Sequence, residues 1–119
     1  MSEKYRIERW KEIYPPYPSM LRLLMVLDGY RVEQWGSRSQ MIIPKQKHSL
    51  DRSHWIVSGA LKLAVDDVGI FVLEAGDRDF MTAETRYSAQ VVSEEPVIYL
   101  VGQRAVAAKA KRKKPKKVK

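Results

Sequence analysis

Cysteine is absent from this chain of 119 residues, which excludes disulfide bonds, thiolate metal sites and cysteine nucleophiles. Long apolar runs are missing too. The densest stretch, residues 20–27, has seven apolar residues in eight positions, whereas a helix that spans a bilayer needs about 20. The first nine residues are charged and have no apolar core, so they do not resemble a secretory signal. These absences predict one cytoplasmic domain with its own hydrophobic core and no membrane segment.

Positive charge is concentrated at one end of the chain. The net charge is +8, but residues 1–108 hold 14 basic and 14 acidic residues, and Lys109–Lys119 holds eight basic residues and no acidic one. Like charges at this density oppose compaction, so we expect a disordered tail over 104–119. Such a tail could contact nucleic-acid phosphates without sequence preference. A solvated tail that only improves solubility is the alternative.

Alternating and β-branched apolar segments, interrupted every eight to ten residues by turn-forming residues, dominate residues 30–101. This spacing predicts eight short antiparallel strands and an all-β barrel or double sheet. The expected strands are Tyr30–Trp35, Ser39–Pro44, Arg52–Val57, Leu61–Val65, Ile70–Leu73, Asp79–Ala83, Tyr87–Val92 and Val97–Val101.

The N-terminal segment, residues 1–18, mixes charged and aromatic residues and ends in Tyr-Pro-Pro-Tyr-Pro. Proline blocks both a helix interior and the hydrogen bonds of a sheet. We therefore expect an extended arm that lies on the folded domain, residues 19–103, through Trp10, Tyr14 and Tyr17.

A short helix is expected between Ser19, as its N-cap, and Leu27, with Gly29 in the left-handed conformation that often ends a helix. Because seven of its last eight residues are apolar, more than one face of the helix needs a partner. The arm and the barrel could cover both faces, or the outer face could form the contact of a homodimer.

Three segments resemble the small single-domain cupins: His48 to Gly59, the turn Ala75-Gly76-Asp77, and the strand that ends in Tyr99-Leu100-Val101-Gly102. The resemblance covers residues 30–102 and implies a jelly-roll barrel, also called a double-stranded β-helix, preceded here by the short helix. Many cupins hold a divalent metal with two histidines one residue apart, a glutamate four residues later and a late histidine. Metal-dependent dioxygenases and isomerases belong to the family, and so do barrels with storage or regulatory roles.

The metal motif of the family falls on residues that are mostly not ligands. Its spacing, carried onto this chain, places the paired histidines on Gln46 and His48, the glutamate on Arg52 and the late histidine on Tyr87. A cation near 4 Å from a dication costs roughly 8 kcal/mol at an effective dielectric near 20. We therefore expect no tightly bound metal and no other cofactor.

Alternation along the strands predicts a polar cavity in the barrel. Gln46 and His48 share one face, and Arg52, His54 and Ile56 share one face of the next strand. If both faces point inward, Gln46, His48, Arg52, His54 and Tyr87 together line a site for a small anionic or polar ligand. Two alternatives stay open. One is a relic pocket in which Arg52 turns out to Asp51 or pairs with an acid of the barrel, and the other is a metal site rebuilt around the two histidines.

Two further groups complete the prediction. Asp77 and Asp79 flank a turn and are expected to cap it. By parity, Trp35 and Trp55 could lie on the outward face of their strands and support a dimer or cover the arm; packing in the core is the role we expect. The predicted function is a non-catalytic cupin-like barrel, with a metal-dependent enzyme that uses unorthodox ligands as the alternative.

Overall fold

The structure is a computed structural model that describes residues 4–10 and 17–105. Within these residues the chain forms nine strands and one helix, whose bounds follow in chain order. They are β1 (Tyr5–Arg9), α1 (Pro18–Leu27), β2 (Arg31–Ser37), β3 (Ile42–Gln46), β4 (Asp51–Ser58), β5 (Ala60–Val65), β6 (Gly69–Glu74), β7 (Asp77–Met81), β8 (Tyr87–Val91) and β9 (Val97–Arg104).

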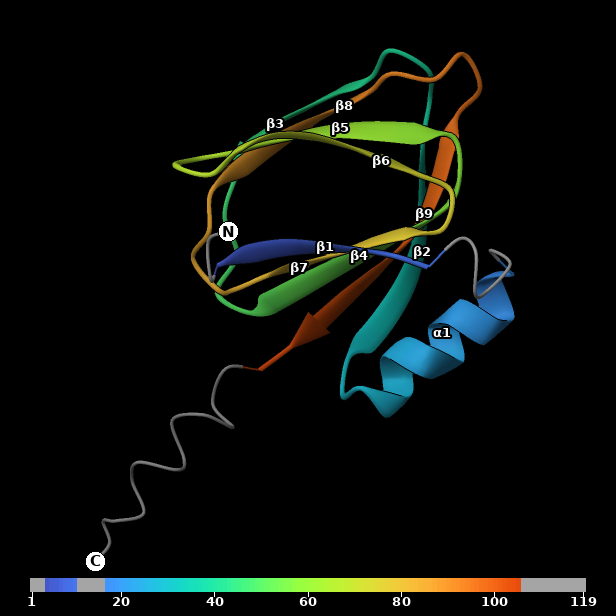
Figure 1. Ribbon diagram of the computed structural model, residues 1–119, viewed down its shortest axis with the longest axis vertical. Helices are drawn as coiled ribbons and strands as arrows, with labels where there is room; N and C mark the ends of the chain where they lie inside the picture. The colour runs from blue at the N-terminus through green and yellow to red at the C-terminus, as the bar shows by residue number, and fades with distance from the viewer. Residues whose placement is uncertain (1–3, 11–16, 106–119) are drawn as a thin grey trace, which may run out of the picture.

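Two antiparallel sheets face each other and enclose the main core, as Figure 1 shows. The larger sheet has the strand order β1-β7-β4-β9-β2 and the smaller has the order β3-β8-β5-β6. Strand β5 illustrates why the sequence folds in this way. Leu61, Leu63 and Val65 alternate with Lys62 and Ala64, and the first three are buried between the sheets. The predicted all-β architecture is therefore confirmed.

Helix α1 covers the outer face of the larger sheet (Figure 1). Leu21 and Met25 of α1 pack with Trp55 and Leu100 in a second buried cluster. Trp55 thus lies on the outward face, as alternation predicts, and α1 covers it. The predicted left-handed glycine is also present, since Gly29 has φ +93°.

The start of α1 differs from the prediction. The helix begins at Pro18, one residue before the proposed cap, and Tyr17 occupies the N-cap position without a side-chain hydrogen bond. Proline fits the first helical position because its fixed φ matches the helix and its missing N–H is not needed there. Ser19 is therefore inside the helix and does not cap it.

The segment predicted as an arm contributes a strand to the larger sheet. Residues 5–9 form β1, which pairs with β7 from Tyr5 opposite Met81 to Arg9 opposite Asp77. The segment Tyr-Arg-Ile-Glu-Arg has the period of two that a strand requires, but it was too short and too charged to be recognised. One of the expected aromatic contacts is present, because the centroids of the Trp10 and Trp55 rings lie 6.0 Å apart. Tyr17 is exposed, and Tyr14 lies outside the described residues.

Two strand positions are shifted relative to the prediction. Strand β3 begins at Ile42 rather than at residue 39, and β7 spans 77–81 rather than 79–83. In both cases the turn occupies different residues, with Gln40 and Gly76 in positive-φ conformations.

At the other end of the chain β9 continues to Arg104, and the predicted disordered tail lies outside the described residues from 106 onward. None of the described helical residues makes a segment long and apolar enough to cross a membrane.

Candidate functional site

A cavity of about 300 Å³ lies between the two sheets. Gln46, Arg52, His54 and Tyr87 contribute its polar lining. These four residues come from β3, β4 and β8, so both sheets contribute to the cavity. The remaining lining is mostly apolar and consists of Trp35, Gly36, Ser37, Met41, Ile43, Leu61, Ala89, Tyr99 and Val101.

Arg52 is the central polar side chain of the cavity and is 7% exposed. Its Nη1 donates a hydrogen bond to Nε2 of His48 at 2.7 Å and another to the Tyr87 hydroxyl at 2.9 Å. Its Nε is buried without a hydrogen-bond partner among the residues that the structure describes. No described carboxylate lies within 4.0 Å of this guanidinium. Arg52 is therefore a buried cation without a counter-ion in the part of the chain that the structure describes.

The neighbours of Arg52 are neutral at pH 7. Burial lowers the pKa of His48, and the positive charge of Arg52 lowers it further. Neutral His48 can accept the Arg52 hydrogen bond through Nε2, whereas a protonated ring could not. Burial also raises the pKa of Tyr87, although Arg52 opposes that shift. The three side chains therefore carry one positive charge in total.

A second polar group in the barrel joins His54 to Asp79. Nδ1 of His54 lies 3.0 Å from Oδ1 and 3.2 Å from Oδ2 of Asp79. The backbone N–H of His54 donates to Oδ1 at 2.8 Å, and the Tyr5 hydroxyl donates to Oδ2 at 2.9 Å. Because Asp79 is fully buried, these bonds replace the water that the carboxylate loses on folding. They also fix the orientation of the His54 ring at the cavity wall.

The structure brings the predicted residues together. Gln46, Arg52, His54 and Tyr87 line the cavity, and His48 adjoins it through its bond to Arg52. The inward orientation of Arg52 and His54 is confirmed. The two placements of Arg52 expected for a relic pocket, turned out to Asp51 or paired with an acid of the barrel, differ from the structure, in which Arg52 contacts His48 and Tyr87. Ligand binding by the cavity stays a prediction.

Asp79 was missed as a residue of the cavity region. Asp77 does cap the turn, because its Oδ2 accepts the Glu74 backbone N–H at 2.9 Å. Asp79 does not cap it and points into the barrel. A strand that begins at residue 77 places Asp77, Asp79 and the apolar Met81 on one face. This alternation could have predicted that Asp79 points into the barrel. Tyr5 was missed because β1 itself was not predicted.

The donor set at the family's metal position does not fit a divalent cation. His48 is the one motif position that keeps an imidazole, and its Nε2 is occupied by a guanidinium N–H at 2.7 Å. Divalent ions of the first transition row need imidazole, carboxylate or thiolate ligands, and Arg52, Gln46 and Tyr87 supply none of these. In residues 4–10 and 17–105, no three histidine, aspartate or glutamate side chains come together in a way that could hold a metal.

Comparisons with known proteins support the fold but not a specific activity. No protein-family model matches the chain, and no curated protein matches it. The cupin domain of Cnp3 from Schizosaccharomyces pombe is similar in structure, with a TM-score of 0.62, 14% identity, and coverage of 71% of this chain and 58% of that chain. A cupin protein from Bacteroides fragilis has a TM-score of 0.59 at 20% identity and covers 74% and 75% of the two chains.

A third similar structure belongs to an enzyme, the DMSP lyase DddQ from Ruegeria pomeroyi. Its TM-score is 0.59 at 18% identity, with 66% of this chain and 40% of the lyase covered. The chain therefore spans about two fifths of the lyase and somewhat more than half of the Cnp3 domain. Enzymes and other cupin domains thus share this architecture, and at these identities the likeness concerns the fold alone. Together the two facing sheets and these structural neighbours show that the chain has the cupin fold, a double-stranded β-helix.

Proposed function

We propose that this domain is a non-catalytic binding protein that takes a small carboxylate, or another small anion, into the barrel cavity. The observation that carries the proposal is Arg52, a buried guanidinium that has no counter-ion among the described residues. Burying an unpaired charge costs several kcal/mol. A bound anion would recover much of that cost.

The geometry around Arg52 suits a carboxylate. A guanidinium can bind both oxygens of a carboxylate in a forked arrangement, and the buried Nε of Arg52 is a donor that needs an acceptor. The Tyr87 hydroxyl and the His54 ring at the cavity wall can complete the polar contacts. The ligand-binding set in this proposal is Gln46, His48, Arg52, His54 and Tyr87.

The rest of the cavity limits what is attached to the anionic group. Trp35, Met41, Ile43 and Leu61 line it, so the body of the ligand should be apolar. A volume of about 300 Å³ lies at the lower end of the ~300–1,000 Å³ range of ligand pockets. Short-chain or single-ring carboxylates are therefore the expected ligand class.

Replacement of Arg52 by methionine should abolish anion binding without unfolding the protein. Because Arg52 has no ionic partner among the described residues, its replacement by an apolar side chain leaves no unpaired carboxylate there and removes a buried charge whose desolvation is costly. Butyrate, benzoate and phosphate should be compared in thermal-unfolding assays of the wild type and Arg52→Met. Saturating ligand should stabilise the wild type alone, by about 2.7 kcal/mol at 100 times its Kd.

Arg86→Gln is the matched control, because Arg86 is an exposed cation outside the cavity. It should keep the full response to the carboxylate. Equal stabilisation of Arg52→Met, or no response of the wild type to any of the three anions, would contradict the proposal.

The alternative functions rest on weaker support. A metal-dependent cupin enzyme needs ligands that the region around His48 does not supply. Stoichiometric iron, manganese, nickel or zinc in untagged protein would favour it. Nucleic-acid binding through Lys109–Lys119 concerns residues that the structure does not describe and stays a hypothesis. The cytoplasmic location also stays a prediction.

We further propose that the domain forms a homodimer through the outer face of α1. Met20, Leu23, Val26 and Leu27 of this helix are 41–74% exposed. The helix has no acidic residue, and its one basic side chain, Arg22, donates to the Val32 carbonyl. An apolar face on which Arg22 is the one charged residue of the helix can pack against a second copy of itself across a two-fold axis.

The double substitution Leu23→Glu with Leu27→Glu should convert the dimer into a monomer, because two glutamates would face each other across the axis. Light scattering coupled to size-exclusion chromatography should give twice the chain mass for the wild type and the single mass for the variant. Ile70→Glu, which changes an exposed apolar residue of the smaller sheet, should remain dimeric. A monomeric wild type, or a variant that stays dimeric, would exclude this interface.

A further inference from the structure

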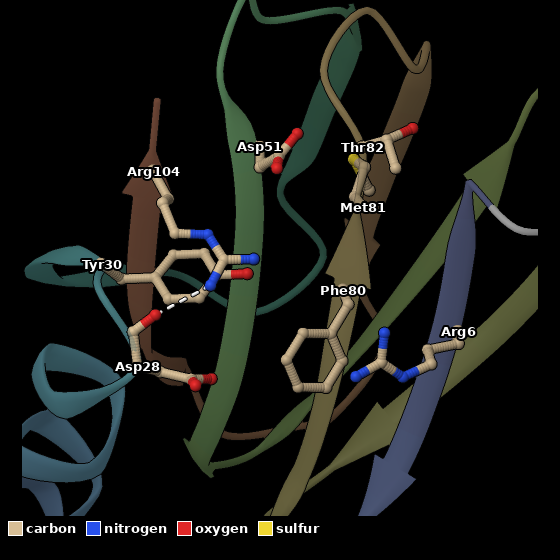
Figure 2. Close-up of a pocket in the computed structure, with 8 residues that line it drawn as sticks. All are labelled: Arg6, Asp28, Tyr30, Asp51, Phe80, Met81, Thr82 and Arg104. Carbon is tan, nitrogen blue, oxygen red and sulfur yellow. Dashed lines mark hydrogen bonds between the residues drawn. The ribbon is translucent and has the colours of Figure 1, made fainter. Parts of the chain in front are cut away.

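The two faces of β4 differ in how their polar side chains are used. Figure 2 shows the outer face of the larger sheet, where a second pocket, of about 280 Å³, lies beside the end of α1. Its four charged residues all have partners within the protein: Arg6 pairs with Glu8, Asp28 with Arg78, Asp51 accepts the Ala83 N–H, and Arg104 donates to the Asp28 carbonyl. The inner face of β4 is different, because one ring nitrogen of His54 is not used in this way.

The position of the proton on the His54 ring follows from its contacts with Asp79. Both oxygens of Asp79 accept hydrogen bonds, since Oδ1 receives the His54 backbone N–H at 2.8 Å and Oδ2 receives the Tyr5 hydroxyl at 2.9 Å. Nδ1 of His54 lies 3.0 Å and 3.2 Å from these two oxygens, so Nδ1 is the nitrogen that carries the proton. In the neutral ring, Nε2 is therefore an acceptor without a proton.

Nε2 of His54 is directed to the cavity. His54 lines the cavity, whereas Asp79, the partner of Nδ1, is not among the residues that line it. Within the described part of the chain, no group donates a hydrogen bond to Nε2. The nearest rings are those of Tyr87 and Tyr99, with centroids 5.7 Å and 5.9 Å from that of His54. Since His54 is only 3% exposed, this acceptor needs a donor inside the cavity.

Arg52 and Nε2 of His54 have opposite requirements for a ligand. The guanidinium only donates hydrogen bonds, and Nε2 of the neutral ring only accepts them. A carboxylate suits Arg52, but it has no proton to give to Nε2. The second polar group of the ligand must therefore be a donor. An ammonium group would place a positive charge near Arg52 in a cavity whose described lining has no carboxylate, so a hydroxyl group fits better.

The spacing of the two residues limits where the hydroxyl lies. Arg52 and His54 are neighbours on one face of β4, and two residues of a strand span about 6.6 Å. Both contact Tyr87, because Arg52 donates to its hydroxyl at 2.9 Å and the His54 ring packs against its ring. A ligand about as long as one aromatic ring can reach both groups. On such a ring, the meta or para position suits this separation, and the position next to the carboxylate is too close.

We infer that the ligand of the barrel cavity is a hydroxylated carboxylic acid, whose carboxylate binds Arg52 and whose hydroxyl donates to Nε2 of His54. This inference rests on the proposed function and specifies its ligand class. A carboxylic acid without a hydroxyl leaves Nε2 unpaired, and a dicarboxylic acid places a second anion against it. Arg52 supplies the attraction in this arrangement, and His54, oriented by Asp79, supplies the selectivity.

A series of benzoates tests the inference on the unmodified full-length protein. Calorimetric titrations at pH 8, above the range in which an imidazole ordinarily protonates, compare benzoate with its hydroxylated and methoxylated derivatives. The better of 3-hydroxybenzoate and 4-hydroxybenzoate should bind about tenfold more tightly than benzoate, because it pairs a buried acceptor. 4-Methoxybenzoate lacks the proton, and the hydroxyl of 2-hydroxybenzoate bonds to its own carboxylate. Neither should bind more tightly than benzoate.

The outcomes separate this inference from the proposed function. If benzoate binds and Arg52→Met abolishes its binding, but no hydroxybenzoate binds more tightly, the proposed function holds and the inference fails. A gain for 4-methoxybenzoate equal to that for 4-hydroxybenzoate also overturns the inference, because an apolar contact would then explain the gain. If none of the benzoates binds, both fail.

His54→Asn tests the acceptor directly. Asparagine can place an amide N–H near the position of Nδ1, where it can donate to Asp79, but it has no atom at the position of Nε2. The preference for the hydroxybenzoate over benzoate should disappear in this variant. Arg86→Gln, which changes an exposed residue outside the cavity, should keep the full preference. A preference that survives in His54→Asn overturns the inference.

The proton on the ring can be observed without any ligand or variant. Long-range ¹H–¹⁵N correlation spectra of the full-length protein at pH 8 should show a protonated Nδ1 and an unprotonated Nε2 for His54. The same is expected for His48, whose Nε2 faces an Arg52 N–H at 2.7 Å, so both histidines of the chain should show this tautomer. A proton on Nε2 of His54 overturns the inference even if a hydroxybenzoate binds.

Discussion

Replacement of Asp79 by alanine is expected to lower the free energy of unfolding by several kcal/mol, because each buried donor left without an acceptor costs about 1–3 kcal/mol. The substitution leaves the His54 backbone N–H, the His54 ring and the Tyr5 hydroxyl without their shared acceptor. Burial and the Asp79 charge raise the pKa of Tyr5, so Tyr5 is a neutral donor that needs an acceptor. Urea denaturation at pH 7 measures the loss.

Tyr5→Phe separates the contribution of one hydrogen bond from that of the whole group. It removes one bond to a charged acceptor and should cost about 1.5–3 kcal/mol. In the double variant, the two effects should not add, because Tyr5 and Asp79 are in direct contact. An Asp79→Ala variant as stable as the wild type would show that Asp79 does not hold His54 in place.

Replacement of Trp55 by alanine is expected to cost about 3–5 kcal/mol, the usual range for a buried tryptophan. Trp55 is 1% exposed and joins α1 to the larger sheet through Leu21, Met25 and Leu100. Its ring also lies 4.9 Å from Cζ of Arg78. Its removal would leave a cavity under α1 and uncover a buried guanidinium. Chemical denaturation followed by circular dichroism measures the loss and reports on the helix.

Trp55→Phe is the control for shape and volume. It keeps an aromatic ring and loses the hydrogen bond from Nε1 to the Gly76 carbonyl at 3.1 Å. Its cost should therefore be smaller, near 1–3 kcal/mol for the unsatisfied carbonyl and the lost volume. If alanine and phenylalanine destabilise the fold equally, the contact with α1 contributes little and the hydrogen bond dominates.

Much of the barrel was predictable because strand patterns are local. The alternation of Leu61, Leu63 and Val65 identifies β5 without reference to any other strand. The same rule placed Arg52 and His54 on one face of β4, and the structure shows that this face lines the cavity. β1 was not predictable in this way, because five residues with three charges carry no strong local signal.

The partners of the polar residues could not be predicted from the sequence. Asp79 and His54 are 25 residues apart, and they meet because β4 and β7 pair with His54 opposite Asp79. Tyr5 reaches the same carboxylate from 74 residues away. Such contacts depend on strand order and register, and many orders are compatible with the same set of short strands.

The sequence by itself determined that the chain folds into short antiparallel strands, that Arg52 and His54 share one face of β4, and that residue 52 is an arginine where the resemblance to cupins implies a carboxylate. These properties follow from residue type and spacing along single strands. Only the tertiary structure decided that Arg52 meets His48 and Tyr87 but no described acid, and that Arg6 and Arg104 share an outer pocket. The reason is physical: packing two sheets fixes which distant side chains meet, and no local pattern encodes that choice.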